Sequence, residues 1–148
     1  MNAYLEMKER HQKEFNEFPM KFAFSDKQFE EGMRELGLKP TDTDKIYKFG
    51  NTGGFYRRSD AEQLHEMFKR QTEEEEAAIA ADTDGTGYAY EMFYYELGNH
   101  EYSYTYDTED TLNALGYKSI DELKMVPQLY LAFTNAKAQY EIDHKMFD

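Results

Sequence analysis

The segment Asp82–Gly87, with the sequence DTDGTG, contains the residue types from which calcium-binding loops are built. It places side-chain oxygens at the first, third and fifth loop positions and a glycine at the sixth, as an EF-hand does. An EF-hand also needs a bidentate glutamate at the twelfth position, where this chain has Phe93. We therefore expect an interhelical turn with a helix cap here, and a weak cation site is the alternative.

The four histidines, His11, His65, His100 and His144, are scattered along the chain and form no HExxH motif. A metal or hydrolytic centre would have to assemble in three dimensions, for instance around Asn99, His100, Glu101 and Asp107. Because 30 acidic residues produce such neighbourhoods by chance, we predict that the protein is not an enzyme and needs no cofactor. The competing hypothesis is a divalent-cation-binding or metal-dependent hydrolytic protein that uses Asp82–Gly87 or the His100 region.

The strongest chemical signal is the distribution of charge. The chain has 17 Lys and Arg against 30 Asp and Glu, a formal net charge of −13. Residues 1–70 hold 13 of each sign, so the whole imbalance lies in the second half. Residues 71–117, the acidic segment, contain no basic residue but 12 acids and eight tyrosines. Solvated helices usually mix the two signs, so function is expected in this segment.

This excess of negative charge excludes sequence-independent binding to DNA, RNA or an anionic membrane, since each would repel the protein. The partner expected is a basic protein surface. A dense field of carboxylates can take the place of nucleic-acid phosphates, and tyrosine rings stack on arginine planes. We therefore predict a non-catalytic interaction protein that presents a DNA-mimicking surface to a basic groove. A solvated face that only maintains solubility is the simpler interpretation.

The residues predicted to form this surface are acids and tyrosines of the acidic segment. They are Glu73, Glu74, Glu75, Glu76, Asp82, Asp84, Asp107, Glu109 and Asp110, with Tyr102, Tyr104 and Tyr106 as contacts. Glu91, Glu96 and Glu101 are five residues apart, about 140° of helical rotation per step, so one helix cannot present them together. The surface must therefore combine several elements.

Helix signals dominate the elements that must position these residues. Apolar spacing and three capping boxes predict helices over residues 3–18, 26–36, 59–81, 88–99, 108–115 and 127–145, with a further one from residue 119. Residues 102–106 are expected to be extended or a loop. Two aromatic segments around the glycine-rich stretch 50–54 predict a small hairpin or a glycine-rich loop. The predicted fold class is mainly α (α+β): one compact domain, residues 1–148, with about six or seven helices and one small β-hairpin near residues 45–58.

Composition sets further bounds. The absence of cysteine excludes disulfides and thiolate-bound metals, while a hydrophobic content of 40% provides for a core. The longest apolar runs are about five residues, far short of the roughly 20 that span a bilayer. The first ten residues lack the apolar run of a signal peptide. We expect a soluble cytoplasmic protein with no membrane partner, and the composition leaves its oligomeric state open.

Five short motifs carry a resemblance to known proteins: FPMKFAF from Phe18, EGM from Glu31, LGLKPTD from Leu36, GGFYR from Gly53 and NHEY from Asn99. Through them, over most of its length, the chain resembles small acidic proteins of unknown function encoded by phages and mobile elements of gut bacteria. The resemblance transfers no catalytic residue. It implies a setting in which such proteins inhibit host nucleic-acid-handling enzymes, anti-CRISPR proteins among them, so the implied partner is a CRISPR effector nuclease in the bacterial host cytoplasm.

Overall fold

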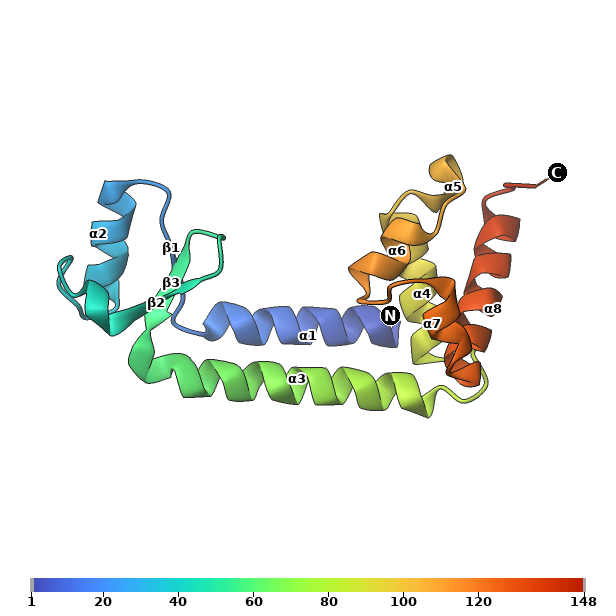
Figure 1. The fold of residues 1–148 in the computed structure, drawn as a ribbon, viewed down its shortest axis with the longest axis horizontal. Helices are drawn as coiled ribbons and strands as arrows, with labels where there is room; N and C mark the ends of the chain where they lie inside the picture. The colour runs from blue at the N-terminus through green and yellow to red at the C-terminus, as the bar shows by residue number, and fades with distance from the viewer. Residues whose placement is uncertain (1, 148) are drawn as a thin grey trace. The chain divides into compact units, whose positions relative to one another are not determined.

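The computed structural model describes residues 2–147, which form eight α-helices and one small sheet (Figure 1). The helices are α1 (Ala3–Glu17), α2 (Asp26–Glu35), α3 (Ala61–Ala81), α4 (Tyr88–Asn99), α5 (Tyr102–Thr105), α6 (Glu109–Ala114), α7 (Ile120–Lys124) and α8 (Pro127–Asp143). Two 3-10 turns cover Thr43–Lys45 and Arg58–Asp60. The predicted mainly helical class is confirmed. None of the described helices is long and apolar enough to cross a membrane.

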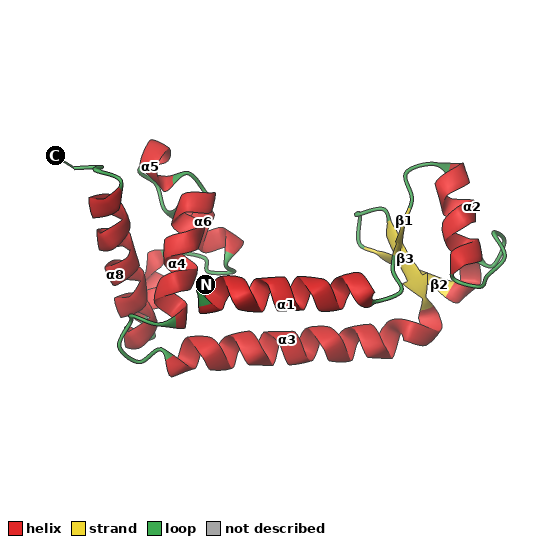
Figure 2. Ribbon diagram, turned by 180° about the vertical axis from the view of Figure 1, so that it is seen from behind, coloured by secondary structure: helices red, strands yellow, loops and turns green. Residues whose placement is uncertain are grey.

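The sheet has three antiparallel strands, β1 (Lys21–Phe22), β2 (Ile46–Phe49) and β3 (Gly54–Arg57), with β3 in the middle (Figure 2). In the β2–β3 hairpin Lys48 lies opposite Phe55, which also pairs with Lys21 on the other side. The hairpin predicted near residues 45–58 is therefore confirmed. The strand β1 was not predicted, because two residues are too few to show an alternating pattern.

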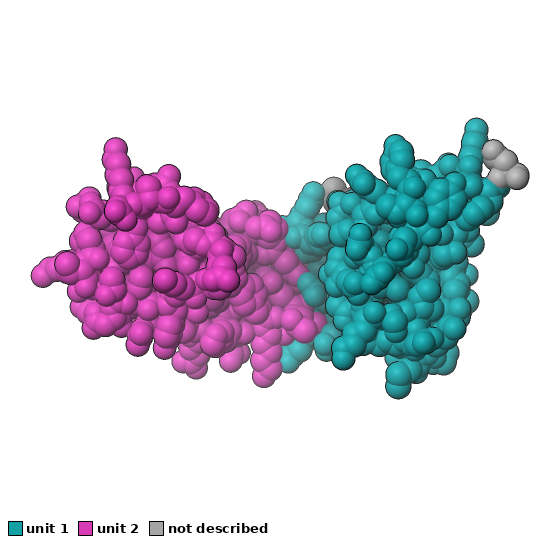
Figure 3. All heavy atoms as spheres, turned by 45° about the horizontal axis from the view of Figure 1, so that its top comes forward, with its two compact units in different colours: residues 1–9, 73–148 teal, residues 10–72 magenta. Residues whose placement is uncertain are grey.

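The chain divides into two compact units: unit 1, residues 1–9 and 73–148, and unit 2, residues 10–72 (Figure 3). The buried apolar residues divide in the same way, into two clusters within each unit. Both α1 and α3 contribute residues to both units. The single domain predicted from the sequence therefore contains separate cores.

The core of unit 1 forms where α4 packs along α8. The ring of Phe93 on α4 meets that of Phe133 on α8 edge to face, with 5.3 Å between centroids, and both side chains are fully buried. Ala132 and Ala136 on α8 have no exposed surface and allow the two helices to approach closely. This packing fixes α4, which carries more of the acidic segment's buried residues than any other element.

Unit 2 packs its sheet between helices. Phe55 on β3 is buried against Met33 and Leu36, while Tyr56, the next residue along, belongs to a second cluster with Phe18 and Leu64. Successive residues of a strand point to opposite faces, so β3 serves two apolar clusters at once.

Candidate functional site

Formal charge separates between the two units. Unit 1 contains 19 Asp and Glu against 5 Lys and Arg, a net charge of −14, whereas unit 2 contains 11 and 12, a net charge of +1. The imbalance noted along the sequence is therefore a property of one compact body. A site that attracts basic or cationic partners is therefore expected on unit 1.

The exposed acids of the predicted set fall into two groups within unit 1. Glu73, Glu75 and Glu76 lie on the last turns of α3, followed by Asp84 in the next loop, while Glu74 is half-buried. Asp107, Glu109 and Asp110 lie at the start of α6, and all three are exposed. Figure 1 shows the end of α3 and the α5–α6 region on different sides of this unit, so the predicted acids do not form one continuous face.

Asp82 does not belong to this surface, and its prediction as a partner contact is wrong. Its carboxylate is buried and accepts hydrogen bonds from the backbone N–H groups of Thr86 and Tyr90, each at 3.1 Å. Tyr90 is the third residue of α4, so Asp82 caps that helix. The predicted interhelical turn with a helix cap is therefore confirmed. Within residues 2–147 no group of three or more His, Asp or Glu side chains could hold a metal ion.

Replacing Asp82 with alanine should lower the free energy of unfolding by about 2 kcal/mol, because two backbone N–H groups lose the buried carboxylate that accepts from them. Urea titration followed by circular dichroism measures the change. Asp84→Ala removes an exposed carboxylate from the same loop and is the matched control. Equal losses in the two variants would contradict the capping role of Asp82.

Tyr102 is also inside the unit, contrary to its prediction as a contact residue. Only 2% of it is exposed, and its hydroxyl donates to Oε1 of Glu141 at 2.6 Å. Burial and this hydrogen bond raise the pKa of Tyr102. Lys137 pairs with the same carboxylate oxygen at 2.7 Å. Tyr102 therefore anchors α5 to α8.

The short helix α5 projects from unit 1 and carries the most exposed tyrosine of the predicted set (Figure 1). Tyr104 is 85% exposed. The residues on either side of α5, Glu101 with φ 57° and Tyr106 with φ 59°, are both left-handed, a conformation that costs a non-glycine residue about 1 kcal/mol. Residues 102–106 thus form one helical turn instead of the predicted extended segment or loop, because the buried Tyr102 fixes its inner side.

Tyr106 shows what maintains this strained conformation. Its hydroxyl donates to the backbone carbonyl of Met146 at 2.8 Å, and its ring meets Phe147 edge to face with 5.4 Å between centroids. Tyr106 is half exposed, so it combines a structural contact with an open ring face. The α5–α6 face, defined here as Tyr104, Tyr106, Asp107, Glu109 and Asp110, therefore presents aromatic and acidic groups on a fixed backbone.

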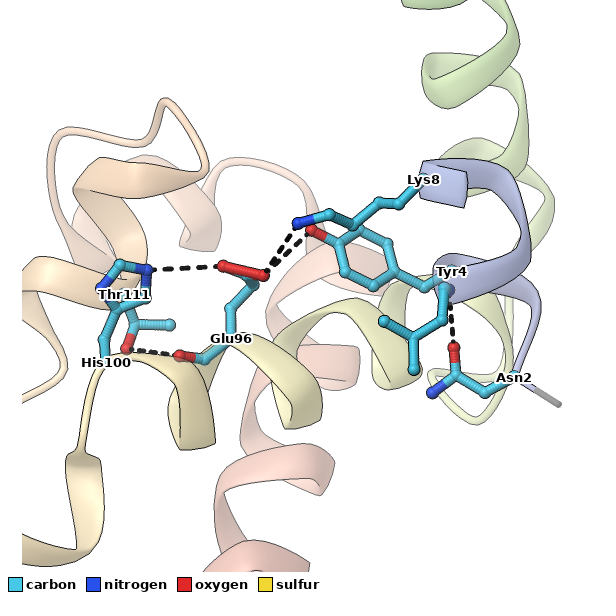
Figure 4. Close-up of polar contacts among 7 residues, drawn as sticks. Asn2, Tyr4, Lys8, Glu96, His100 and Thr111 are labelled. Carbon is cyan, nitrogen blue, oxygen red and sulfur yellow. Dashed lines mark hydrogen bonds and ion pairs between the residues drawn. The ribbon is translucent and has the colours of Figure 1, made fainter. Parts of the chain in front are cut away.

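Glu96 on α4 is a buried carboxylate, 4% exposed, with several polar partners (Figure 4). Its Oε1 accepts a hydrogen bond from the Tyr4 hydroxyl at 3.3 Å and lies 3.6 Å from Nζ of Lys8. Its Oε2 lies 3.4 Å from Nε2 of His100, and its backbone carbonyl accepts from the Thr111 hydroxyl at 3.4 Å. The Glu96 carboxylate thereby joins α1 to α4, and the Glu96 backbone carbonyl joins α4 to α6.

The surroundings of Glu96 favour a structural role over acid–base chemistry. Burial, together with the neighbouring Glu96 carboxylate, raises the pKa of Tyr4 far above its ordinary value, so the phenol stays protonated. The predicted His100 region is not assembled, since Glu101 is exposed and the Asp107 carboxylate accepts from the backbone N–H of Glu109. The partner of His100 is instead Glu96, four residues earlier on the same helix face. Glu96 and His100 are four positions apart, and so are Tyr4 and Lys8. Residues at this spacing lie on one face of a helix, so the sequence could have predicted that each pair shares a face.

One family model matches residues 3–139, and its description is a family of unknown function, DUF7659. Because the match covers most of the chain, the protein belongs to this family. A search of curated proteins and a search of solved structures found no match. The family description names no activity, so the CRISPR effector implied by the resemblance stays a prediction.

Proposed function

We propose that this member of the DUF7659 family is a non-catalytic interaction protein that binds a basic protein surface through its α5–α6 face. The observation that carries the proposal is the position of Tyr104. A large side chain that is 85% exposed stands on a turn with left-handed residues at both ends, next to three exposed acids. The unit that holds it has a net charge of −14.

The physical chemistry of interfaces supports this assignment. Tyrosine is enriched among the few residues that supply most of the binding energy at protein interfaces, because a rigid ring buries a large area at a small cost in entropy. The anchored backbone of α5 reduces the ordering cost that binding would otherwise impose. Asp107, Glu109 and Asp110 supply the charge that steers a basic partner to the ring.

The nature of the partner follows from the spacing and sign of the charge. A basic groove that accepts several carboxylates close together is typical of proteins that bind nucleic-acid phosphates. We therefore propose that the protein competes with nucleic acid for such a groove. On the resemblance to phage and mobile-element proteins, a CRISPR effector nuclease is the first partner to test. The acids on α3 lie on another side of the unit and would contribute long-range attraction instead of contacts.

The test is to reverse the charge of the α5–α6 face. A partner is first captured from a bacterial lysate, and its affinity is then measured for the wild type and for a variant with Asp107, Glu109 and Asp110 changed to Lys. We expect the affinity to fall at least about tenfold, and wild-type binding to weaken steeply between about 50 and 300 mM salt. Tyr104→Ala should weaken binding as well.

The matched control changes Glu73, Glu75 and Glu76 to Lys, which alters the net charge by the same amount on another side of unit 1. Its affinity should change less than that of the α5–α6 variant. Equal losses in the two variants would mean that net charge alone matters, and unchanged binding by the α5–α6 variant would refute the assigned face. Competition by duplex DNA for the captured partner then tests the DNA-mimic part separately.

A further inference from the structure

We propose that unit 2 pairs with a second copy of itself, and that each copy places the ring of Phe24 in a hollow of the other. The hollow has a volume of about 770 Å³ and is lined by the start of α2, the segment before it and the β2–β3 hairpin. The lining residues that carry the argument are Phe24, Asp26, Phe29, Ile46, Lys48 and Phe55. None of them belongs to the α5–α6 face, so this proposal stands or falls independently of the proposed function.

Phe24 is a large apolar side chain that lies mostly in water, with an exposed fraction of 78%. It stands immediately before Ser25, the N-cap of α2, and an apolar residue at that position often packs on the fourth helical residue. Here that residue, Phe29, packs on Phe55 instead, with 4.9 Å between ring centroids. The ring of Phe24 is therefore left for a contact outside its own chain.

The position of Phe24 is nevertheless fixed. Its backbone N–H donates to Oε1 of Gln28 at 2.8 Å, and the Gln28 N–H donates to the Ser25 hydroxyl, which completes a capping box. One side of its ring lies on Gly53, where an added Cβ atom would come 2.7 Å from Cε1 of Phe24. Gly53 also has φ 82°, so the backbone and the ring both favour glycine there. A ring that is already held in place loses little entropy when a partner covers it.

The hollow beside Phe24 offers apolar surface to such a ring. Phe55 is its buried floor, whereas Phe29 and Ile46 are only half-buried and keep some of their surface exposed. Phe24 itself stands at the rim, so a projecting ring and a recess are neighbours on one surface. Two copies related by a two-fold axis can therefore exchange rings, because each offers the other both halves of the contact.

The charges that line the hollow identify the occupant as a second copy. Asp26 and Lys48 both line it, and both are exposed. No ion pair of the described residues includes either of them. A two-fold axis would place Lys48 near Asp26 of the partner subunit, and Asp26 near Lys48 of the partner subunit. A partner with charge of only one sign would instead be repelled by one of the two.

The net charges of the units favour the same arrangement. Two copies that met through unit 1, with a net charge of −14, would repel each other strongly. Unit 2 has a net charge of +1, so it can face its own copy without that cost. A dimer formed in this way would carry two α5–α6 faces, and a partner with two basic sites could bind both.

The experiment measures the mass of the full-length protein by sedimentation equilibrium, over total concentrations from about 1 to 500 µM at about 150 mM salt. We expect a reversible equilibrium between monomer and dimer with a dissociation constant below about 100 µM, and no larger species, because a two-fold contact closes on itself. Phe24→Ala should raise this dissociation constant at least about tenfold, since it removes the ring that fills the hollow. Met125→Ala is the matched control, because Met125 is 82% exposed but lies on unit 1.

Reversal of the two charges tests the two-fold arrangement itself. Lys48→Glu and Asp26→Lys, each alone, place like charges together and should weaken the dimer at least about threefold. The double variant with both changes restores opposite charges across the axis and should recover most of the affinity. Circular dichroism and urea midpoints check that every variant folds.

Three results would overturn the proposal. The first is a chain that stays monomeric over the whole concentration range, which would leave the hollow to a different partner. The second is a dimer that the folded Phe24→Ala variant retains, or that Met125→Ala weakens equally. The third is a double charge reversal that dimerises no better than the single ones.

Discussion

Replacing Glu96 with alanine is expected to lower the free energy of unfolding by about 3 kcal/mol, one of the two largest effects of any substitution considered for this protein. The buried carboxylate has two oxygens, and both are engaged, by Tyr4 and Lys8 on one side and by His100 on the other. Its loss leaves the Tyr4 hydroxyl, on a residue that is 8% exposed, without this acceptor. An orphaned buried donor costs more than the hydrogen bond itself contributes.

Urea unfolding of the Glu96→Ala variant, followed by circular dichroism, measures this loss. Glu96→Gln keeps the shape and an acceptor oxygen but removes the charge, so its stability should fall between the alanine variant and the wild type. Glu101→Ala, an exposed carboxylate five residues away, should change stability by no more than about 0.5 kcal/mol. If the Glu96 and Glu101 variants were equally stable, the contacts of the Glu96 carboxylate with α1 and His100 would not contribute to stability.

Gly85→Ala should also lower the free energy of unfolding by about 3 kcal/mol, from two separate causes. Gly85 has φ 69°, a left-handed conformation that alanine adopts at a cost of about 1 kcal/mol. In addition, an added Cβ atom would lie 2.9 Å from the backbone N of Ala132 on α8, so the loop or the helix would have to shift. That shift would disturb the hydrogen bond from the Asn135 side chain to the Gly85 carbonyl, at 3.1 Å.

Gly116→Ala separates these two causes. Gly116 also has a positive φ, 89°, but no atom lies within 4 Å of the position its Cβ would take. Its replacement should therefore cost only the conformational strain, about 1 kcal/mol. The difference between the two alanine variants in urea unfolding measures the close approach of the loop to α8. No difference would show that α8 yields to the added methyl group without cost.

The elements that could be predicted from the sequence are those with a strong local signal. The helices α2, α4 and α8 have apolar residues at helical spacing. One of the capping boxes in the sequence precedes α2, where the hydroxyl of the N-cap residue Ser25 accepts from the N–H of Gln28. The hairpin followed from the glycines between two aromatic segments. The pairing of β1 with β3 depends on residues more than 30 positions apart, which a local pattern does not contain.

Charge counting predicted that the excess of acid lies in the second half of the chain, and unit 1 carries it, because formal charge needs no geometry. It could not tell which acids reach the surface. Asp82 and Asp84 share one loop, yet one caps a buried helix end and the other is exposed. Tyr102 and Tyr104 likewise differ only in which side of one helical turn they occupy. The direction of a side chain depends on the backbone around it, and in α5 that backbone is set by contacts with residues near 140–147.

The division into units also bears on the order in which the chain acquires structure during synthesis. Unit 2 is one continuous stretch, residues 10–72, and all of it is translated before residues 73–148 of unit 1. Unit 1 needs residues from both ends of the chain: the hydrogen bond between Tyr4 and Glu96 spans 92 positions, and Tyr4 also belongs to the core that Phe133 completes. The first residues of α1 must therefore wait, without their final partners, until α8 has been translated. Such distant contacts form slowly, which makes the acidic body the last part of the protein to mature.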